Sequence, residues 1–397
     1  MLIYPLISAI FFPLWRVLAS KNSWIKKVES DRSWKSDAPI KGNVIWMHSA
    51  SLGEFEMGRP VLEKFLEQHS GWNAVVTFFS PSGYLPRKNY SRAKVHYLPV
   101  DTNSEAEAWL AYCRPKVALF IRYDIWPNHL NALRKRNIPL VLVAMSASST
   151  PWYLSKWLPL IRKNVLASIH TWGVVNDEDA TTLSRAGVRS TILGNPKFDY
   201  AAQLINVAAP KRYLNWKTAQ TKPILLVGSS HNQDIRFLSQ LDYSAYSIWV
   251  VPHKPEDAQN QKTLLPELNA LDERDVAQEV DLLVITEFGV LSSLYSLADA
   301  VIVGGGFGKA THNILEATVQ GKVVMTGPNW HKVSENQSLI QKGYLKSSRS
   351  KHDWNHYLED ARKGLLLEKG KEAQKWLLEQ QGASENILKK LEQAVQL

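Results

Sequence analysis

The chain has 397 residues, of which 45% are hydrophobic and 21% are charged, and none of its segments is rich in Gln, Ser or Pro. This composition excludes a disordered or fibrous protein and is typical of an ordered globular one. The chain is longer than one hydrophobic core usually supports, so we expect two α/β domains with a cleft between them.

The formal net charge of +10 favours anionic partners, which include nucleic acid, an anionic membrane and phosphorylated substrates. Nucleic acid is not expected as a partner, because the sequence contains no helix-turn-helix, zinc-finger or aromatic-basic ribonucleoprotein motif. Cys113 is the only cysteine, which excludes an intramolecular disulfide and a cysteine-based zinc site and indicates a reducing, cytosolic environment.

The first predicted element is an apolar segment over residues 1–20, interrupted by Pro5 and Pro13. Its uncharged run stops before Arg16 and is shorter than the about 20 residues that a spanning helix needs. The basic residues follow the apolar run instead of preceding it, which does not fit a secretory signal. We therefore expect a membrane anchor that lies in the interface, with a spanning helix as the alternative.

From residue 44 onward, short β-branched runs alternate with helical stretches, which predicts parallel sheets with crossover helices. The pattern restarts at residue 223 after a polar segment without a strand signal. We therefore expect a first domain over residues 40–205 and a second over 215–397. Ligands of open α/β sheets bind beyond the carboxyl ends of the strands, so the loops after these runs are candidates for chemistry.

The loop HSASLGEFEMGRP follows the first strand and leads into a helix, so Glu54 is expected at the helix N-terminus. The helix dipole there keeps a carboxylate ionised and lowers its basicity. A catalytic base in this place needs partial burial to regain a useful pKa. The alternative is an ordinary acidic residue of a first helical turn.

Other polar residues follow later strands of both halves. Asp124 lies in IRYDIWPN and Lys197 in GNPKFD, whereas His231 and His253 follow strands of the second half and can donate to a nucleotide or an acidic sugar. Residues 151–166 combine Trp, Tyr and basic side chains at helical spacing, which fits either contact with lipid headgroups or packing on a sheet.

The segment GGGFGKATHNILEA, residues 304–317, follows the strand DAVIV. Glycines such as Gly306 and Gly308 permit close backbone approach to a phosphate, and Lys309 adds positive charge. The segment is neither a P-loop nor a dinucleotide fingerprint, because Val303, Lys309 and Ala310 stand at positions where those motifs need other residues.

A helix is expected to follow the glycines, with His312, Asn313 and Glu316 on its first turns and its free N–H groups facing an anion. Glu316 comes four residues after His312, so the two share a face, and its carboxylate can accept ribose hydroxyls. One His with one Glu makes a poor metal site, and we expect no metal. A purely structural helix start is the alternative.

Taken in order, these segments resemble the Kdo transferases, which move 3-deoxy-manno-octulosonic acid (Kdo) from CMP-Kdo to the lipid A precursor of Gram-negative envelopes. The resemblance covers residues 40–345 and is closest to the branch found in Bacteroidetes. It is carried by SLGEFE, GRP, YLPVDT, IWPN, GNPKFD, VPHKPE, GGGFGK, HNILEA and GPNWHK.

The resemblance implies an α/β fold of the GT-B type, with two Rossmann-like domains facing a central cleft. The first domain would bind the acceptor and the second the CMP-sugar donor. The implied enzyme is an inverting glycosyltransferase of lipopolysaccharide core biosynthesis that needs no cofactor besides its donor. Its implied partners are CMP-Kdo, the lipid A precursor (lipid IVA) and the anionic inner-membrane surface, at the cytoplasmic face.

The resemblance also implies roles for individual residues. Glu54 would be the base that deprotonates the acceptor hydroxyl, and Asp124 and Lys197 would stabilise the transition state. The donor would be bound by Pro252, His253, Phe288, Gly289, Val290, Gly306, Gly308, Lys309, His312, Asn313, Ile314, Leu315 and Glu316.

The chain departs from the family pattern at several of these positions. Asp124 is one carbon shorter than the glutamate of the family, and His253 stands where many members have arginine. Phe288, Gly289 and Val290 stand where the motif usually reads M-G-E. Two other classes of function remain as alternatives. One is another GT-B nucleotide-sugar transferase or an epimerase, and the other is a non-catalytic nucleotide-sensing protein.

Overall fold

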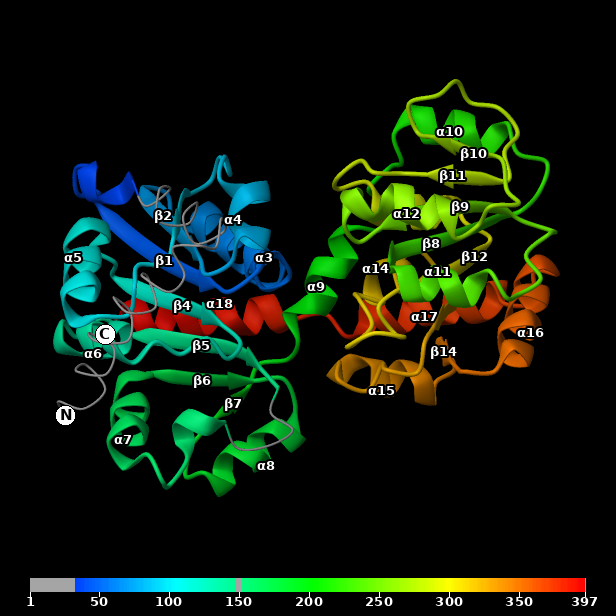
Figure 1. Cartoon of the computed structure of the whole chain (residues 1–397). Helices are drawn as coiled ribbons and strands as arrows, with labels where there is room; N and C mark the ends of the chain where they lie inside the picture. Colours follow the sequence, from blue (N-terminus) through cyan, green and yellow to red (C-terminus); the bar gives the residue numbers. More distant parts are fainter. Residues whose placement is uncertain (1–32, 147–150, 397) are drawn as a thin grey trace. The chain divides into compact units, whose positions relative to one another are not determined.

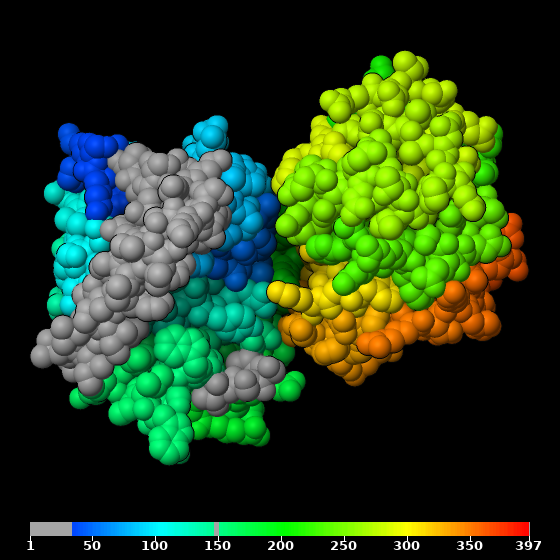
Figure 2. Space-filling model, viewed as in Figure 1, coloured from blue at the N-terminus to red at the C-terminus, as the bar shows by residue number. Residues whose placement is uncertain are grey.

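The computed structural model describes residues 33–146 and 151–396, which fall into two compact units (Figure 1). The first unit contains the described residues up to Tyr200 together with those from Gln381 onward, and the second runs from Ala201 to Gln380. Each unit is built around one parallel sheet of seven strands, and the chain is closely packed within each unit (Figure 2). The prediction of two α/β sheets is confirmed.

The predicted membrane anchor, residues 1–20, lies outside the described residues. Among the residues that are described, no helix combines the length and the apolar character needed to cross a membrane.

The sheet of the first unit has the strand order β3-β2-β1-β4-β5-β6-β7. Its strands are β1 (Asn43–Ser49), β2 (Trp72–Phe78), β3 (Lys94–Tyr97), β4 (Val117–Ile121), β5 (Leu140–Met145), β6 (Thr171–Val174) and β7 (Thr191–Ile192). Every residue of β4 and β5 is buried, as expected for central strands of a parallel sheet that is covered on both faces.

Helical segments of the first unit pack on both faces of this sheet. Side chains alternate between the two faces, so Trp46 belongs to the apolar cluster on one face and Met47 to the cluster on the other. The helical segments are η1 (Ser33–Ser36), α3 (Leu52–Gln68), α4 (Pro81–Arg87), α5 (Asn103–Cys113), α6 (Pro127–Lys135), η2 (Trp152–Leu154), α7 (Pro159–Ser168), α8 (Asp177–Arg185), α9 (Pro196–Gln203) and α18 (Ala383–Val395).

The last helix, α18, corrects the predicted domain boundary, because residues 381–396 belong to the first unit and not to the second (Figure 1). Its apolar side chains, among them Ile387 and Leu391, join the cluster on the α3 face of the first sheet. The backbone N–H of Gly382 donates to Asp199 Oδ1 at 3.1 Å, which places a carboxylate at the start of α18, where the helix dipole favours it. The amphipathic helix therefore completes the first core.

The sheet of the second unit has the order β10-β11-β9-β8-β12-β13-β14. Its strands are β8 (Ile224–Ser230), β9 (Ser247–Pro252), β10 (Ala270–Asp272), β11 (Leu282–Val284), β12 (Ala300–Val303), β13 (Val324–Thr326) and β14 (Leu345–Ser347). Its helical segments are α10 (Lys211–Thr218), α11 (Asn232–Leu238), η3 (Pro255–Asp257), α12 (Ala258–Thr263), α13 (Leu291–Leu294), η4 (Tyr295–Leu297), α14 (Leu315–Thr318), α15 (Ser334–Gln341), α16 (Lys351–Arg362) and α17 (Leu367–Glu379).

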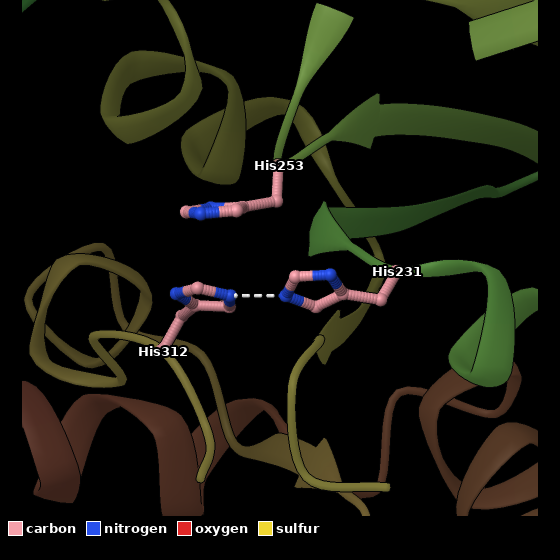
Figure 3. Close-up of side chains that lie close together, drawn as sticks. All are labelled: His231, His253 and His312. Carbon is pink, nitrogen blue, oxygen red and sulfur yellow. Dashed lines mark hydrogen bonds between the residues drawn. The ribbon is translucent and has the colours of Figure 1, made fainter. Parts of the chain in front are cut away.

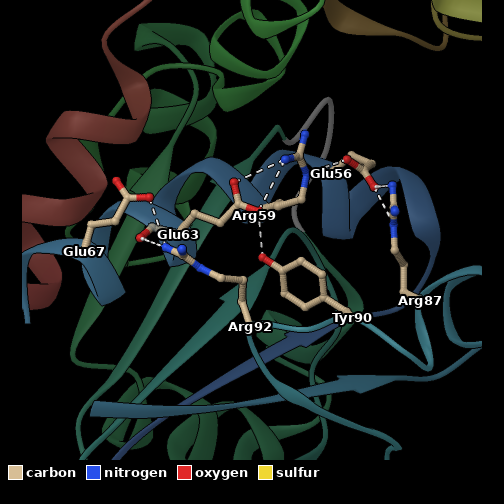
Figure 4. Close-up of polar contacts among 7 residues, drawn as sticks. All are labelled: Glu56, Arg59, Glu63, Glu67, Arg87, Tyr90 and Arg92. Carbon is tan, nitrogen blue, oxygen red and sulfur yellow. Dashed lines mark hydrogen bonds and ion pairs between the residues drawn. The ribbon is translucent and has the colours of Figure 1, made fainter. Parts of the chain in front are cut away.

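Helix α3 is fixed along its polar face by a network of charged side chains (Figure 4). Glu56 is nearly buried and accepts from Arg59 Nε at 2.8 Å and from Arg87 Nε at 3.0 Å. Two turns further, Glu63 accepts from Arg59 and from the Tyr90 hydroxyl, the latter at 2.7 Å. These bonds tie α3 to the segment that ends α4 and leads to β3, so the helix that begins beside Glu54 has a fixed position.

The packing of α18 gives a first prediction. Leu391 is fully buried, so Leu391→Ala leaves a cavity and should lower the free energy of unfolding by about 2–5 kcal/mol. Urea denaturation followed by circular dichroism measures the change. The matched control is Lys389→Ala on the exposed side of the same helix. Equal stability of the two variants would show that α18 is not part of the first core.

Candidate active site

The strand order of each sheet reverses once, between β1 and β4 in the first unit and between β8 and β12 in the second. At such a point the connections that follow the two strands pass to opposite faces of the sheet. This opens a crevice beyond the carboxyl ends of the two strands, and ligands bind there. Glu54 follows β1 and Asp124 follows β4, whereas the glycine-rich segment follows β12. Glu54, Asp124 and the glycine-rich segment therefore lie at the point where each sheet is built to bind a ligand.

Glu54 is held by the first turn of α3. It is the third residue of the helix and forms a capping box with Ser51. Its Oε2 accepts from the backbone N–H of Ala50 at 2.7 Å and of Ser51 at 3.2 Å. The capping box satisfies two N–H groups at the helix start and fixes the direction of the carboxylate.

The pKa of Glu54 is raised above its ordinary value of 4.5. Burial is the largest cause, and the nearby Asp124 carboxylate acts in the same direction. The positive charge of Arg122 and the hydrogen bond from Ala50 oppose the rise without cancelling it. The partial burial that a base at a helix start needs is present.

Asp124 contacts a buried histidine that the sequence analysis did not identify. His48 Nε2 lies 2.7 Å from Asp124 Oδ2, and its Nδ1 lies 2.9 Å from Thr77 Oγ1. The His48 side chain is fully buried, whereas that of Asp124 is 22% exposed. The chain reaches Asp124 through Arg122, whose φ of 68° lies in the left-handed region that non-glycine residues rarely adopt. This turn brings Asp124 from the end of β4 to the end of β1.

Two motifs of the sequence meet beside this pair. Asp101 of YLPVDT is fully buried, and its Oδ1 accepts from the backbone N–H of Asn128 at 3.1 Å and of His129 at 3.0 Å. These bonds cap α6 in the IWPN segment. Trp126, which precedes α6, places its Nε1 3.3 Å from His48 Nε2. The motifs therefore fix the surroundings of His48 and Asp124.

Lys197 lies on the first turn of α9, after the edge strand β7. Its backbone N–H donates to Asn195 Oδ1 at 3.1 Å. Glu54 and Asp124 are thus brought together with His48 and Arg122, and Lys197 lies at the start of α9. Its role in stabilising a transition state stays a prediction.

The glycine-rich segment of the second unit is packed against its neighbouring loops. A Cβ on Gly304 would lie 2.5 Å from Ser229 O, and one on Gly306 would lie 2.5 Å from Gly327 N. Gly305 donates its N–H to Asp234 Oδ2 at 3.0 Å. The space beside Gly304 and Gly306 is therefore filled by neighbouring loops of the protein itself. Gly308 has more space, because the nearest atoms lie 3.4 Å from its Cβ position.

The helix predicted to begin at His312 begins at Leu315 and ends at Thr318, so this prediction is wrong. The backbone N–H of His312 donates to Gly304 O at 3.0 Å, which keeps residue 312 in the loop. Asn313 Oδ1 accepts from the Leu315 N–H at 3.2 Å, and its Nδ2 donates to Glu316 Oε1 at 3.0 Å. Glu316 therefore pairs with Asn313 and does not share a helical face with His312.

His312 instead meets two other histidines (Figure 3). Its Nε2 lies 2.8 Å from His231 Nε2, and its ring stacks on that of His253 with centroids 4.2 Å apart. Burial, together with the two neighbouring rings, lowers the pKa of His312 to about 3. Burial also lowers the pKa of His253. These two imidazoles are neutral at physiological pH.

The remaining donor candidates divide by exposure. Phe288 is 69% exposed and Lys309 is exposed, so both side chains are accessible to a ligand. The buried ones are Pro252, Val290, Ile314 and Leu315. Gly289 has a φ of 84° and forms the turn between β11 and α13.

Comparison with known proteins gives these residues a context. Residues 22–200 match the family model described as 3-deoxy-D-manno-octulosonic-acid transferase (kdotransferase). A 3-deoxy-D-manno-octulosonic acid transferase of Bordetella pertussis is 26% identical over 392 residues, which cover 90% of this chain and 89% of that protein. The chain is a homologue of the Kdo transferases. A second such relative, from Chlamydia muridarum, is 24% identical over 88% of this chain and 86% of its own length.

This homology makes the chain a glycosyltransferase, and solved structures agree on the fold. A glycosyltransferase of Rickettsia africae matches with a TM-score of 0.61 at 12% identity, over 90% of this chain and 98% of that one. The UDP-GlcNAc 2-epimerase of Neisseria meningitidis matches with a TM-score of 0.58 at 14% identity, over 89% and 100% of the two chains. Such low identities show the fold alone, which is GT-B-like. The GT-B-like α/β fold with two parallel sheets, which the sequence resemblance implied, is therefore confirmed.

The raised pKa of Glu54 predicts a pH-dependent cost to stability. The folded chain binds the Glu54 proton more tightly than the unfolded chain does, so this residue lowers stability as the pH rises above the ordinary pKa of 4.5 toward the folded-state value. Glu54→Gln keeps a capping-box side chain and removes the charge. Its stability relative to the wild type should therefore be higher at about pH 8 than at about pH 4.

Thermal unfolding at the two pH values measures this difference. Glu178→Gln is the matched control, because Glu178 is an exposed carboxylate on the first turn of α8. A Glu54→Gln variant that loses stability as the pH rises, relative to the wild type, would contradict the described burial of the carboxylate.

Proposed function

We propose that this Kdo transferase homologue moves Kdo from CMP-Kdo to the lipid A precursor (lipid IVA), with inversion at the sugar carbon, in lipopolysaccharide core biosynthesis. Homology over most of the chain to curated Kdo transferases supports the reaction class. The observation that carries the mechanism is the Glu54 carboxylate, whose pKa is raised by burial at the switch point of the first sheet.

In the proposed reaction Glu54 takes the proton of the acceptor hydroxyl. The two backbone bonds hold Oε2, so Oε1 receives the proton. The acceptor oxygen forms a bond to the anomeric carbon of Kdo while the bond from that carbon to the CMP phosphate breaks, and CMP leaves with the electron pair. A base with a raised pKa takes this proton more readily than an ordinary carboxylate does.

The transition state has oxocarbenium character, so positive charge develops on the sugar. We assign to Asp124 the role of offsetting this charge, because His48 and the turn at Arg122 hold its carboxylate beside Glu54. Lys197 is assigned to the negative charge of the sugar carboxylate or the departing phosphate. The donor is assigned to the second unit, at the carboxyl ends of β8, β9 and β12.

We also propose that the chain works at the cytoplasmic face of the inner membrane. Two exposed tryptophans support this, because Trp152 at the start of η2 is 57% exposed and Trp157, after η2, is 92% exposed. Beside them runs a groove lined by Lys156, Arg162 and Lys163. Exposed Trp together with basic side chains suits the headgroup region of an anionic bilayer.

The transferase proposal is tested with CMP-Kdo, lipid IVA and mass spectrometry of the lipid. The wild type should add Kdo, and Glu54→Ala should bind CMP normally while its transfer rate falls about 10²–10⁴-fold, the usual contribution of a general base. Glu178→Gln should transfer as the wild type does. Lack of any Kdo adduct from folded wild-type protein would overturn the reaction, and a Glu54→Ala rate within tenfold of wild type would overturn the base.

The alternative epimerase function is tested in the same preparation. Incubation with UDP-GlcNAc should give no 2-epimer, because the proposed donor is CMP-Kdo. Epimer formation without Kdo transfer would favour the alternative.

The membrane proposal predicts that Trp157→Ser weakens binding to vesicles of anionic and zwitterionic phospholipid severalfold, as measured by co-sedimentation. Val276→Ser is the matched control, because Val276 is 85% exposed and lies in the second unit. Equal vesicle binding by both variants would exclude Trp157 from the membrane contact.

A further inference from the structure

We propose that His231, His253 and His312 form a binding site for a divalent transition metal ion such as Zn²⁺, with one coordination position open to an anion. The site itself does not depend on the proposed transferase activity, whereas the identity of the anion rests on that proposed function. The ligand atoms of the three histidines lie within 4.8 Å of one another. Figure 3 shows the three rings gathered at one place.

The topology of the second sheet brings these residues together. His231 follows β8, His253 follows β9, and His312 lies in the loop after β12. These three strands are neighbours in the order β9-β8-β12, so their carboxyl ends meet at one edge. Residues that are 81 positions apart in the chain thereby come into hydrogen-bond distance.

The backbone around the three histidines is tied into one network. His231 caps α11, and its N–H donates to Asp234 Oδ2 at 2.8 Å, the atom that also accepts from Gly305. The N–H of His253 donates to Ser230 O at 2.9 Å. A Cβ on Gly305, whose φ is 88°, would lie 3.0 Å from the His312 ring. The backbone positions of the three histidines are therefore fixed by these bonds, and the rings can turn on this frame.

The spacing of the rings suits a tetrahedral metal ion. Zn–N bonds of about 2.0–2.1 Å place the ligand nitrogens of a tetrahedral site about 3.3 Å apart. The distance between the Nε2 atoms of His231 and His312 is 2.8 Å, and the limit for the whole group is 4.8 Å. The His253 and His312 rings are stacked at an interplanar angle of 27°, so ring rotation about the side-chain bonds has to accompany metal binding and turn the nitrogen lone pairs toward one ion.

Metal ions bind neutral imidazole through the lone pair of one ring nitrogen. At 2.8 Å the Nε2 atoms of His231 and His312 share one hydrogen, since two lone pairs would repel each other at that distance. On metal binding the ring that carries this hydrogen changes its tautomer. Its Nε2 loses a proton and its Nδ1 takes one up, so the ring stays neutral and Nε2 presents a lone pair to the ion.

The charge of the cluster indicates what the open position takes. The three ligands are neutral, so a bound divalent ion keeps both of its charges, and three protein ligands with one open position is the arrangement of catalytic zinc sites. The His253 residue is exposed, which gives a ligand access. At this site the ion would offset the charge of the donor phosphate as a Lewis acid.

The test uses the full chain without a histidine tag, freed of metal by chelation and dialysis. Isothermal titration with Zn²⁺ should give one site with a Kd on the order of 1 µM or tighter, and Co²⁺ should give the visible absorption of a tetrahedral site. His253→Ala and His253→Arg should weaken binding about tenfold or more and abolish that absorption. Both variants are checked for folding by circular dichroism, and His253→Arg retains a long polar side chain in case the smaller residue destabilises the loop.

The matched control is His352→Ala, which removes an exposed histidine of α16 whose ring stacks on that of His356. It should bind Zn²⁺ as the wild type does. Wild-type binding no tighter than that of His253→Arg, or loss of binding in His352→Ala, would overturn the proposal. Kdo transfer by a wild-type chain that binds no metal would overturn the metal site and leave the proposed function standing. Metal binding without Kdo transfer would overturn the proposed function and leave the metal site standing.

Discussion

Both sheets of this protein are wound outward from a central pair of parallel strands, β1 with β4 and β8 with β12. Parallel strands end at one edge, and crossovers that leave the central pair toward opposite faces keep the loops there apart. In the first unit these loops carry Glu54 and Asp124, and in the second they carry His231 and the glycine-rich segment. The positions of Glu54, Asp124, His231 and the glycine-rich segment depend on this reversal of strand order.

The state of Glu54 is a balance between opposing effects. The helix start and the N–H groups of Ala50 and Ser51 stabilise its charged form, as does the positive charge of Arg122. Burial destabilises that form more strongly, so the pKa rises. The capping box thus provides a fixed direction for the carboxylate, and burial provides its basicity. A buried, charged Glu54 lowers the stability of the fold, and a neutral side chain at this position would raise it. Active-site residues often reduce stability in this way.

The sequence predicted the features that depend on local patterns. Alternating apolar runs indicated the two parallel sheets, and the turn SLGEFE indicated Glu54 at a helix start. The helix after the glycines was placed too early, because the bond from the His312 N–H to Gly304 O is a tertiary contact that helical spacing does not report. The segment 381–396 was assigned to the wrong unit, since an amphipathic pattern predicts a helix but not the core on which it packs.

The groups that the sequence missed act through partners far along the chain. His48 belongs to the site because it contacts Asp124, which lies 76 residues further along the chain. Strand alternation predicts only that its side chain lies on the same face of the sheet as Trp46. The three histidines belong to three separate loops, and each alone is an ordinary polar residue after a strand. Only the strand order β9-β8-β12 shows that they meet. A sequence pattern does not report which loops lie side by side, because the strand order of the sheet decides which loops are neighbours.

The central claim is that burial makes the Glu54 carboxylate a stronger base than an ordinary glutamate. The most direct measurement is an NMR titration of the chain with ¹³C-labelled glutamate carboxyl carbons, in which the Glu54 resonance is identified by its absence from Glu54→Gln. The account predicts that this resonance titrates at a pH above the ordinary value of 4.5. A Glu54 resonance that titrates at or below that value would contradict the account, because the helix start and Arg122 would then outweigh burial.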